Sequence, residues 1–443
     1  AVGAVGLARD RDAVLATLSD LGLPSSALQG RTLSARSWAC QLALGSTAIA
    51  LAGSLGERWR TVLQTTATAL SFVPSERTDG HAPTTVAAPR VPPGPGMIGD
   101  EVAGKAELHF LARSALEPGA LYAALGHVFG HSVWLADEAL AQFVTLLAQL
   151  TAERARDGPP AVVGVLLDEV QRVALANTQR IAAQLPEGAW GPIAEHLFAL
   201  IEASDVSAAY RTHAARVLDA IAYGVLRAVP STAHARQRTL LAAIDRQARA
   251  HGRTSPTDVA VRKAAIDLLL RVLETHAHRL QAGWDMVFGM CRAAAEAAPE
   301  VRAQGTSPLP LLKGAFVCVQ LICSEHLAAL SNEELELCIA CLPSFCTQTE
   351  DTNLALTANG VLWDITADVH RRQATSSAES MSALWLFVLH RMRDTAEVPH
   401  ADVRNGAIAN LFQVLVQYSS ALHPGDWQRI FFEILYPLCD AAS

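Results

Sequence analysis

The sequence contains few aromatic residues and no convincing strand pattern. Phe, Trp and Tyr together make up 6% of the 443 residues, whereas 51% of the chain is hydrophobic, mostly Ala, Leu and Val. Ala and Leu cost least in a helix, while strands favour aromatic and β-branched residues. The composition therefore argues against a β-sheet protein and favours an all-helical one.

Basic residues are also scarce. The chain has 35 Lys and Arg against 43 Asp and Glu, which gives a formal net charge of −8. Binding to the phosphate backbone of nucleic acids needs a basic surface, so this balance argues against that function. Lysine occurs only at Lys105, Lys263 and Lys313. We interpret the excess of Arg over Lys as a bias of the coding sequence rather than as a binding signal.

Membrane and secretion signals are missing too. No uninterrupted apolar run approaches the length of about 18 residues that a transmembrane helix needs. The sequence begins Ala1-Val2-Gly3-Ala4, without an initiator Met or the layout of a signal peptide. We therefore expect a piece of a longer protein. The eight cysteines are too sparse for a secreted disulfide framework, and we expect reduced, buried thiols in the cytoplasm.

Helical periodicity recurs along the chain, with Gly, Pro or small polar clusters as breaks. The stretch Pro74–Lys105 is rich in Pro, Gly and Thr, so we expect a disordered or loosely tethered loop there. The predicted helices cover Arg36–Gly53, Trp59–Ser71, Pro118–Phe129, Trp134–Arg154, Val162–Gln184, Trp190–Ala203, Ala208–Val229, Ala233–Ala250, Ser255–His278, Trp284–Ala297, Leu309–Leu330, Asn332–Gln348, Thr352–Val369, Ala378–Asp394, Ala401–Ser420 and Pro424–Ala442.

Internal similarity identifies the kind of helical protein. The segment that starts Val261-Arg262-Lys263-Ala264 aligns with Val403-Arg404-Asn405-Gly406 at an offset of 142, and the match extends to a Trp beyond each helix. A weaker third copy begins at Tyr210-Arg211. The offset corresponds to three HEAT units of roughly 40–47 residues. We therefore predict an all-α fold, a HEAT/armadillo-like α-α superhelix that forms a single solenoid over residues 1–443.

The repeated unit makes physical sense as a helix hairpin. Asp258 or Asp402 lies in the first turn, where a carboxylate favours the positive end of the helix. We expect the Arg that follows to pair with a carboxylate of a neighbouring repeat. Apolar residues then recur at 3–4 spacing, and the Trp after the turn, such as Trp284, is expected to cover the open end of the hairpin.

Chemistry-bearing motifs are hard to find. Cys338, Cys341 and Cys346 have a CxxC start, but they lie in an apolar helical pattern, which favours core thiols over a zinc knuckle. The sequence has no GxSxG elbow and no phosphate-binding GxxxxGK[ST] loop. We predict no catalytic residues, no metal, no cofactor and no enzymatic activity. The Cys cluster leaves a metal site open as the weaker alternative.

Two surface features suggest contacts with partners. The first is an arginine patch on the predicted helix Ala233–Ala250 and just beyond it, interpreted as a solvated face or as a docking site for an acidic partner or anionic lipid. Its members are Arg236, Arg238, Arg246, Arg249 and Arg253. The second is the segment Asn353–Asp364, in which Gly360 would let a neighbouring backbone approach. Packing within the stack is one interpretation of this segment, and a partner groove that includes Asn353, Trp363 and Asp364 is the other.

The segment Asn353–Asp364, followed by Ser382-Ala383-Leu384-Trp385 and by Val403–Ile408, resembles the carboxy-terminal region of the Mon-two family. These are Sec7-related scaffold proteins of the trans-Golgi network and endosomes. The resemblance implies a non-enzymatic scaffold, peripheral on those membranes, that takes part in endosome-to-Golgi trafficking. Its implied protein partners are a Dopey-type scaffold, an Arf-like small GTPase and a phospholipid flippase. No partner-binding residue can be carried over by position.

Other helical repeat proteins remain as alternatives. Large Arf guanine-nucleotide exchange factors carry similar repeats downstream of their Sec7 domain, so a regulatory region of such an enzyme is the second hypothesis. A HEAT adaptor of nuclear transport or of a phosphatase fits the fold, but not the Asn353–Asp364 segment. A Sec7 domain in the longer protein would decide for the exchange factor.

Overall fold

The computed structural model describes residues 2–23, 35–71, 126–157, 160–249, 254–398 and 400–441. Regular structure within these ranges is helical throughout, with no strand among them. The predicted loop Pro74–Lys105, most of the predicted helix Pro118–Phe129 and the predicted site residue Arg253 lie outside the described residues. The prediction of an all-α protein is confirmed.

The helices fall into two compact units. The first comprises Ala1–Asn177 with Gly188–His196, and the second Thr178–Glu187 with Leu197–Ser443. Each unit has its own core, so the prediction of a single solenoid over residues 1–443 stays a prediction. Helix α9 (Trp190–Glu202) contributes residues to both units.

The first unit contains α1 (Val2–Gly22), α2 (Ala35–Ala50), α3 (Trp59–Leu70), α6 (Asp137–Asp157) and α7 (Pro160–Ala176). Helix α1 packs against α2 and α3, and α3 packs against α6 and α7. The indole of Trp59 meets the ring of Phe143 edge-on, with centroids 4.8 Å apart. The sequence did not predict α1, because glycines and the charged run Arg9–Asp12 interrupt its apolar pattern.

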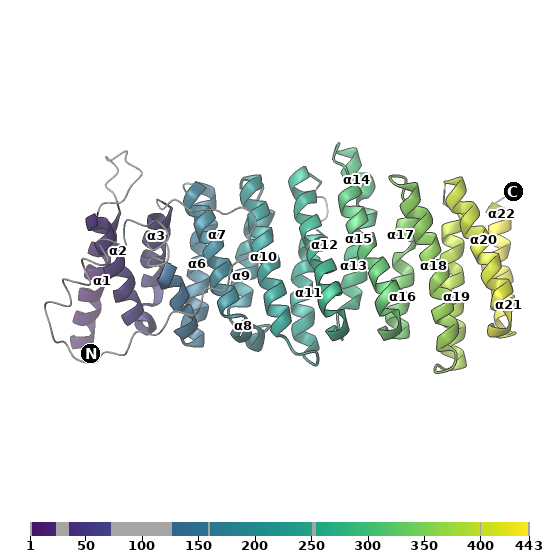
Figure 1. Ribbon diagram of the computed structural model, residues 1–443, viewed down its shortest axis with the longest axis horizontal. Helices are drawn as coiled ribbons and strands as arrows, with labels where there is room; N and C mark the ends of the chain where they lie inside the picture. The colour runs from purple at the N-terminus through teal and green to yellow at the C-terminus, as the bar shows by residue number, and fades with distance from the viewer. Residues whose placement is uncertain are drawn as a thin grey trace. The chain divides into compact units, whose positions relative to one another are not determined.

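The second unit is a stack of helix hairpins that follow one another along the chain (Figure 1). Successive first helices contact each other, and so do successive second helices. The first helices are α10 (Ala208–Ala228), α12 (Pro256–His276), α15 (Leu309–Leu321), α18 (Thr352–Arg372) and α20 (Ala401–Gln417). The second helices are α11 (His234–Ala248), α13 (Trp284–Glu296), α16 (Asn332–Cys341) with α17 (Pro343–Cys346), α19 (Ala378–Ala396), and α21 (Asp426–Arg429) with η8 (Ile430–Leu435) and α22 (Tyr436–Ala441). Two short helices, α8 (Thr178–Gln184) and α14 (Ala298–Ala303), complete the unit.

This pairwise stacking is the HEAT-like arrangement that the sequence predicted. Helix α20 is the third first helix after α12, following α15 and α18, so the two helices lie three repeats apart as the offset of 142 indicated. The predicted Trp is also confirmed, because α3, α9 and α13 each begin at a buried Trp. In α13 the ring of Trp284 stacks on that of Phe288 one turn later, with centroids 6.0 Å apart.

Local sequence explains where the helices begin and break. The hydroxyl of Ser255 accepts a hydrogen bond from the backbone N–H of Asp258, and Pro256 follows in the first turn. Ser331 and Glu334 form a reciprocal capping box on α16. The predicted helix Asn332–Gln348 is divided at Leu342, because Pro343 has no N–H to continue the ladder.

The predicted helix Val162–Gln184 is likewise divided, at Asn177. The amide of this buried residue donates to the carbonyl of Val173 and to the hydroxyl of Ser132. The side chain of Asn177 therefore provides a hydrogen-bond donor for a carbonyl in the last turn of α7. The apolar periodicity of the sequence did not reveal this capping role.

One described stretch, Leu309–Ala329, is long and apolar enough to span a membrane by length and composition, although the sequence prediction excluded any such segment. In the structure, α15 packs against α12 and α13. Its side chains Leu312, Ala315 and Val319 are buried in this packing, as in the core helix of a hairpin stack.

Candidate interaction surfaces

One arginine recurs at the same position of three first helices, and it contacts the end of the preceding hairpin each time. Arg211 donates from Nε to the carbonyl of Ile201 at 2.8 Å, and Arg262 donates from Nε to that of Ala248 at 2.9 Å. Arg404 donates from Nη1 to the carbonyl of Val398 at 3.3 Å. Because the last carbonyls of a helix lack partners within it and carry partial negative charge, a guanidinium satisfies them well. The repeated arginine therefore joins consecutive hairpins.

The predicted pairing of this arginine with a carboxylate is confirmed in one repeat and wrong in another. Arg211 forms an ion pair with Asp258 of the next hairpin. Arg262 forms no ion pair among the described residues, and instead donates from Nη2 to the carbonyl of Ala293 at 3.3 Å. Burial lowers the pKa of the Arg262 guanidinium. The buried guanidinium of Arg262 is therefore bound by backbone carbonyls of α11 and α13, and not by a buried carboxylate.

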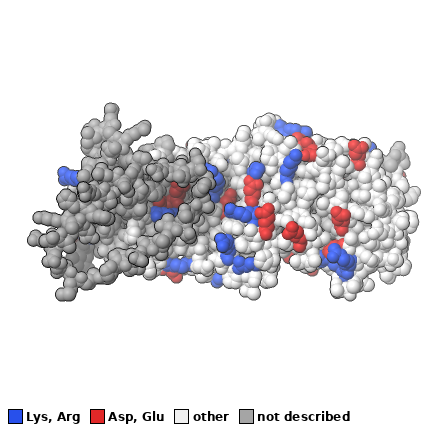
Figure 2. All heavy atoms as spheres, viewed as in Figure 1, with Lys and Arg blue, Asp and Glu red and all other residues white. Residues whose placement is uncertain are grey.

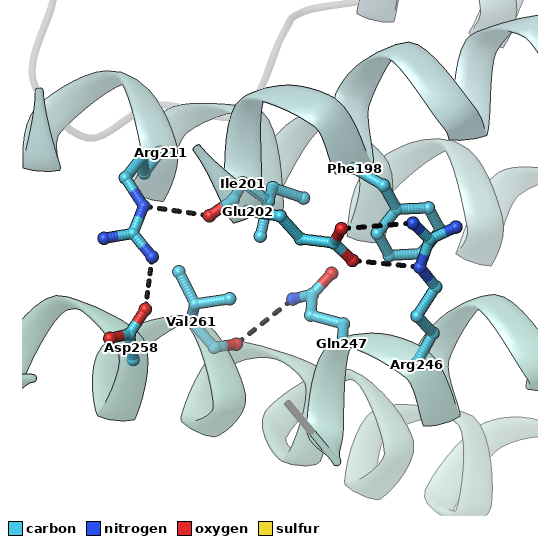
Figure 3. Close-up of a pocket in the computed structure, with 8 residues that line it drawn as sticks. All are labelled: Phe198, Ile201, Glu202, Arg211, Arg246, Gln247, Asp258 and Val261. Carbon is cyan, nitrogen blue, oxygen red and sulfur yellow. Dashed lines mark hydrogen bonds and ion pairs between the residues drawn. The ribbon is translucent and has the colours of Figure 1, made fainter. Parts of the chain in front are cut away.

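The contacts of Arg211 and of a second arginine, Arg246, line a small pocket formed by residues of α9, α10, α11 and α12 (Figure 3). On one side the guanidinium of Arg211 lies between Ile201 and Asp258. On the other, Arg246 holds the carboxylate of Glu202. The cavity measures about 10 Å³, which is room for one water molecule at most. It is a joint of the hairpin stack, too small for a larger ligand.

The described members of the predicted arginine patch lie on α11 and at its C-cap, and two of them bridge to carboxylates of other helices. Arg238 binds Asp285 of α13 through two hydrogen bonds of 2.7 and 2.9 Å, which hold the pKa of Asp285 below its ordinary value. Arg246 binds Glu202 through Nε at 2.9 Å and Nη2 at 3.2 Å. Its guanidinium also covers the ring of Phe198 at 4.1 Å from the centroid. These bonds connect α11 to its neighbours on both sides.

The remaining patch members differ. Arg249 pairs with Asp245 on the same helix, and Arg236 is half-buried. On the face shown in Figure 2, basic and acidic side chains of the second unit are interspersed rather than separated by sign. A role of Arg236, Arg238, Arg246 or Arg249 in binding a partner or a lipid stays a prediction. The sequence did not reveal the pairs because Glu202 and Asp285 lie in other hairpins.

The segment Asn353–Asp364 lies in α18, with one side buried and the other exposed. Asn353 and Asp364 are exposed and Trp363 is half-buried, whereas Leu354 and Leu362 belong to the core. The structure thus places the three predicted residues along the outer part of one helix. Whether they bind a partner stays a prediction.

The predicted close approach at Gly360 is wrong, because a Cβ there would meet nothing within 4 Å. The close approach occurs instead at Gly406 of α20, where a Cβ would lie 3.1 Å from the amide nitrogen of Asn359. The glycine that allows the close approach, Gly406, and the residue that it contacts, Asn359, thus belong to different repeats. Sequence spacing alone could not pair them.

No family model matches the sequence. The Protein MON2 homolog of Drosophila melanogaster is 24% identical over 97% of this chain and 25% of its own length. The homolog of Schizosaccharomyces pombe is 30% identical over 39% of this chain and 12% of its own, and the human homolog is 21% identical over 41% and 12%. These matches confirm the resemblance to the Mon-two family. The chain spans about a quarter of the length of the Drosophila protein.

Solved helical repeat structures are similar to this Mon-two-like chain at low identity. A circular tandem repeat protein with a novel repeat topology is 13% identical, and the match covers 92% of this chain and 96% of that protein with a TM-score of 0.36. Importin beta is 14% identical, covers 92% and 50%, and has a TM-score of 0.28. The hairpins described above, rather than these scores, establish the fold.

The cysteines of the Mon-two-like chain lie mostly in the core of the second unit. Cys338, Cys341 and Cys346 are buried, as predicted. Burial raises the pKa of the Cys346 thiol to about 12 and that of the Cys341 thiol further. Both therefore stay protonated at neutral pH and behave as small apolar groups. Within the described ranges, no three His, Cys, Asp or Glu side chains are grouped as a metal ion would require.

Exposed apolar side chains of the Mon-two-like chain gather on its last described hairpin. Phe412 and Val416 on α20 and Phe431 on η8 are exposed, and so are the neighbouring Phe432 and Tyr436. The sequence did not reveal that these side chains are exposed, because the apolar pattern of α20 was interpreted as core.

Proposed function

We propose that this chain is a non-enzymatic scaffold region that acts in endosome-to-Golgi membrane trafficking, peripheral on the trans-Golgi network and endosomes. The observation that carries the proposal is the similarity to the Drosophila MON2 homolog over 97% of the chain, on a fold made of stacked hairpins. Such stacks expose the outer parts of many helices while the interlocked cores keep them fixed, which suits binding of several partners.

The proposed partners are a Dopey-type scaffold, an Arf-like small GTPase and a phospholipid flippase, as the family resemblance implies. The proposed contact residues on α18 are Asn353, Trp363 and Asp364, because they form the outer part of a helix whose other side is buried. Several weak contacts of this kind combine through effective concentration into stable recruitment. Contact with anionic lipid head groups would use Arg236 together with the paired arginines of α11.

The proposal is tested by recruitment and binding of the chain itself. The tagged chain is expected to locate to trans-Golgi and endosome membranes and to capture the Dopey-type protein and the Arf-like GTPase from cells. Asp364→Lys is expected to weaken capture about tenfold, the effect of losing roughly 1.4 kcal/mol. Glu274→Lys, which changes an exposed acidic residue on α12 in the same way, serves as the control and should bind normally.

Two results would overturn this function. The first is a chain that stays diffuse in cells and captures neither protein. The second is stimulation of nucleotide release from an Arf protein by a Sec7 domain when the chain is added, which would support the regulatory region of an exchange factor. Flotation with anionic liposomes tests the lipid contact separately, and Arg236→Gln is expected to reduce it.

A further inference from the structure

Two thiols of one hairpin face each other across its turn. Cys323 lies in η5 (Ile322–His326), a π-helical turn that follows α15, and Cys338 lies in α16. Their Sγ atoms are 3.6 Å apart. An S–S bond is about 2.05 Å long, so the two sulfurs need to approach each other by roughly 1.5 Å to form one. The fold thus brings together two atoms that a disulfide could join.

Other core thiols of this region have different partners. The thiol of Cys318 points to the carbonyl of Ile266 on α12 at 3.8 Å, and that of Cys341 to the carbonyl of Phe288 on α13 at 3.6 Å. These two thiols therefore take part in the packing of one hairpin on the next. Cys323 and Cys338 instead contact each other within their own hairpin.

Access to solvent distinguishes Cys323 from its neighbours. Cys323 is half-buried, whereas Cys338 is fully buried. The contact with Cys323 and burial raise the pKa of the Cys338 thiol, so that it stays protonated at neutral pH. Cys291 and Cys318 also interact with each other, but both are fully buried. An oxidant dissolved in water therefore reaches Cys323 first.

The π-helical turn is a second feature of this place. Helix α15 ends at Leu321, and η5 continues it with a wider turn. Such turns are rare and occur frequently at functional sites. On the other side of the connection, the capping box of Ser331 and Glu334 fixes the start of α16. The movement that brings the two sulfurs together therefore falls on the irregular turn that carries Cys323.

We propose that Cys323 and Cys338 form a reversible disulfide when the chain meets a peroxide. The deprotonated Cys323 sulfur attacks one oxygen of hydrogen peroxide and breaks the O–O bond, which gives a sulfenic acid and a hydroxide that is protonated to water. The Cys338 sulfur then attacks the Cys323 sulfur. The S–S bond forms, the S–O bond breaks, and the hydroxyl leaves with the Cys338 proton as a second water. Two thiols are oxidised and one peroxide is reduced.

The disulfide acts as a staple between the two helices of this hairpin. It closes a loop that contains η5, η6 (Leu327–Ala329) and the capping box of α16. Helix α15 packs against α12 and α13, and α16 packs against α13 and α19. Because the cross-link restricts the open states of the loop, it makes local unfolding of this hairpin less favourable. A dithiol reductant reverses the reaction by thiol–disulfide exchange and is itself oxidised to a disulfide.

The test is treatment of the purified, folded chain with hydrogen peroxide, followed by alkylation, proteolysis and mass spectrometry without reduction. Cleavage at glutamates separates the two cysteines, and a further cut after Leu321 separates Cys323 from Cys318. The glutamates between Cys323 and Cys338 are Glu325, Glu333, Glu334 and Glu336. The wild-type chain is expected to give a cross-linked peptide pair that dithiothreitol removes.

Substitutions assign the bond. Cys323→Ala and Cys338→Ala are each expected to abolish the cross-link. The matched control is Cys341→Ala, one turn further along α16 and equally buried, which should cross-link as the wild type does. All chains, the wild type included, carry Cys439→Ser, because Cys439 is exposed and would react between chains. The oxidised chain is expected to melt several degrees above the reduced one, and Cys323→Ala should show no such difference.

Circular dichroism checks that each variant keeps its helices, and the half-buried Cys323→Ala decides the matter if Cys338→Ala unfolds. Oxidation of Cys323 to a sulfinic acid without a cross-link would overturn the proposal. A bond from Cys323 to any other cysteine would do the same. So would a cross-link that forms only in urea, because the folded arrangement would then not be its cause. An unchanged Tm after complete cross-linking would show that the bond does not staple the hairpin.

Discussion

The hairpins that begin at α12 and α20 share a sequence pattern but differ in what surrounds them. Around α12, neighbours pack on both sides, so that Ile266 and Phe288 are buried and charged residues remain on the solvent side. Around α20, the equivalent Ile408 is half-buried and Phe431 is exposed, and Lys263, Asp267, Arg271 and Glu274 of α12 have uncharged counterparts. The comparison teaches that the neighbouring helices, more than the residue type, decide whether an apolar residue is buried. The first two predictions below change the same position in both hairpins.

The largest difference is expected at the repeated Trp. Trp284→Ala should lower the free energy of unfolding by about 3–5 kcal/mol, because the ring is buried and stacks on Phe288. Trp427→Ala should lower it clearly less, since Trp427 is half-buried. Urea unfolding of both variants measures the two losses. Equal losses, or no loss for Trp284→Ala, would contradict the capping role of this residue.

The repeated arginine is the next most informative position. Arg262→Leu removes two charge-assisted hydrogen bonds, to the carbonyls of Ala248 and Ala293, of which Ala293 keeps only the backbone N–H of Ala297, and should cost about 2–3 kcal/mol of stability. Arg404→Leu removes the bond to the Val398 carbonyl at a half-buried site and should cost about 1 kcal/mol. Thermal unfolding of the two variants at the same protein concentration compares their losses of stability. If the order were reversed, the carbonyl contacts of Arg262 would not be what holds the hairpins together.

These arginines show how far the sequence predicts the fold and the site. The helices, the three-repeat offset and the buried Trp positions follow from apolar periodicity, because HEAT packing depends on it. The partner of Arg262 does not follow, because a carbonyl at the end of another helix has no signature in the sequence. The same holds for the pairs of Arg238 with Asp285 and Arg246 with Glu202, which join residues of different hairpins. The exposed apolar side chains of α20 and η8 were missed because apolar periodicity alone does not distinguish a covered helix face from an exposed one.

The turn before the second helix gives a smaller effect. Gly283 has a φ of +93°, and a Cβ there would lie 2.4 Å from Leu241 Cδ1, so Gly283→Ala should cost about 1–2 kcal/mol. Gly425 precedes the equivalent helix with a φ of −69°, a conformation open to any residue. Gly425→Ala should therefore change stability little. Differential scanning calorimetry resolves the two, and equal shifts in Tm would show that the turn conformations do not differ.

The smallest effect concerns a buried acid beside α12. Burial raises the pKa of Asp219 on α10 to about 7, while Gln247 and Arg271 lower it and Asp267 raises it. The folded state therefore holds a proton that the unfolded state releases at lower pH. Stability from this group is fully present below the unfolded pKa of about 3.9 and is lost as pH rises through about 7, by about 1 kcal/mol between pH 6 and 7.

Two variants isolate this group. Asp219→Asn should remove its share of the pH dependence and be more stable than wild type at pH 8, leaving the part due to Glu169, whose pKa burial also raises to about 7. Arg271→Gln installs the residue of α20 and removes a favourable charge, so the loss of stability should move to higher pH. Urea unfolding between pH 5 and 8 follows both. If Asp219→Asn left the pH dependence of the unfolding free energy unchanged, this carboxyl would be ionised in the folded chain. The charged residues of α12 would then have no effect on its protonation.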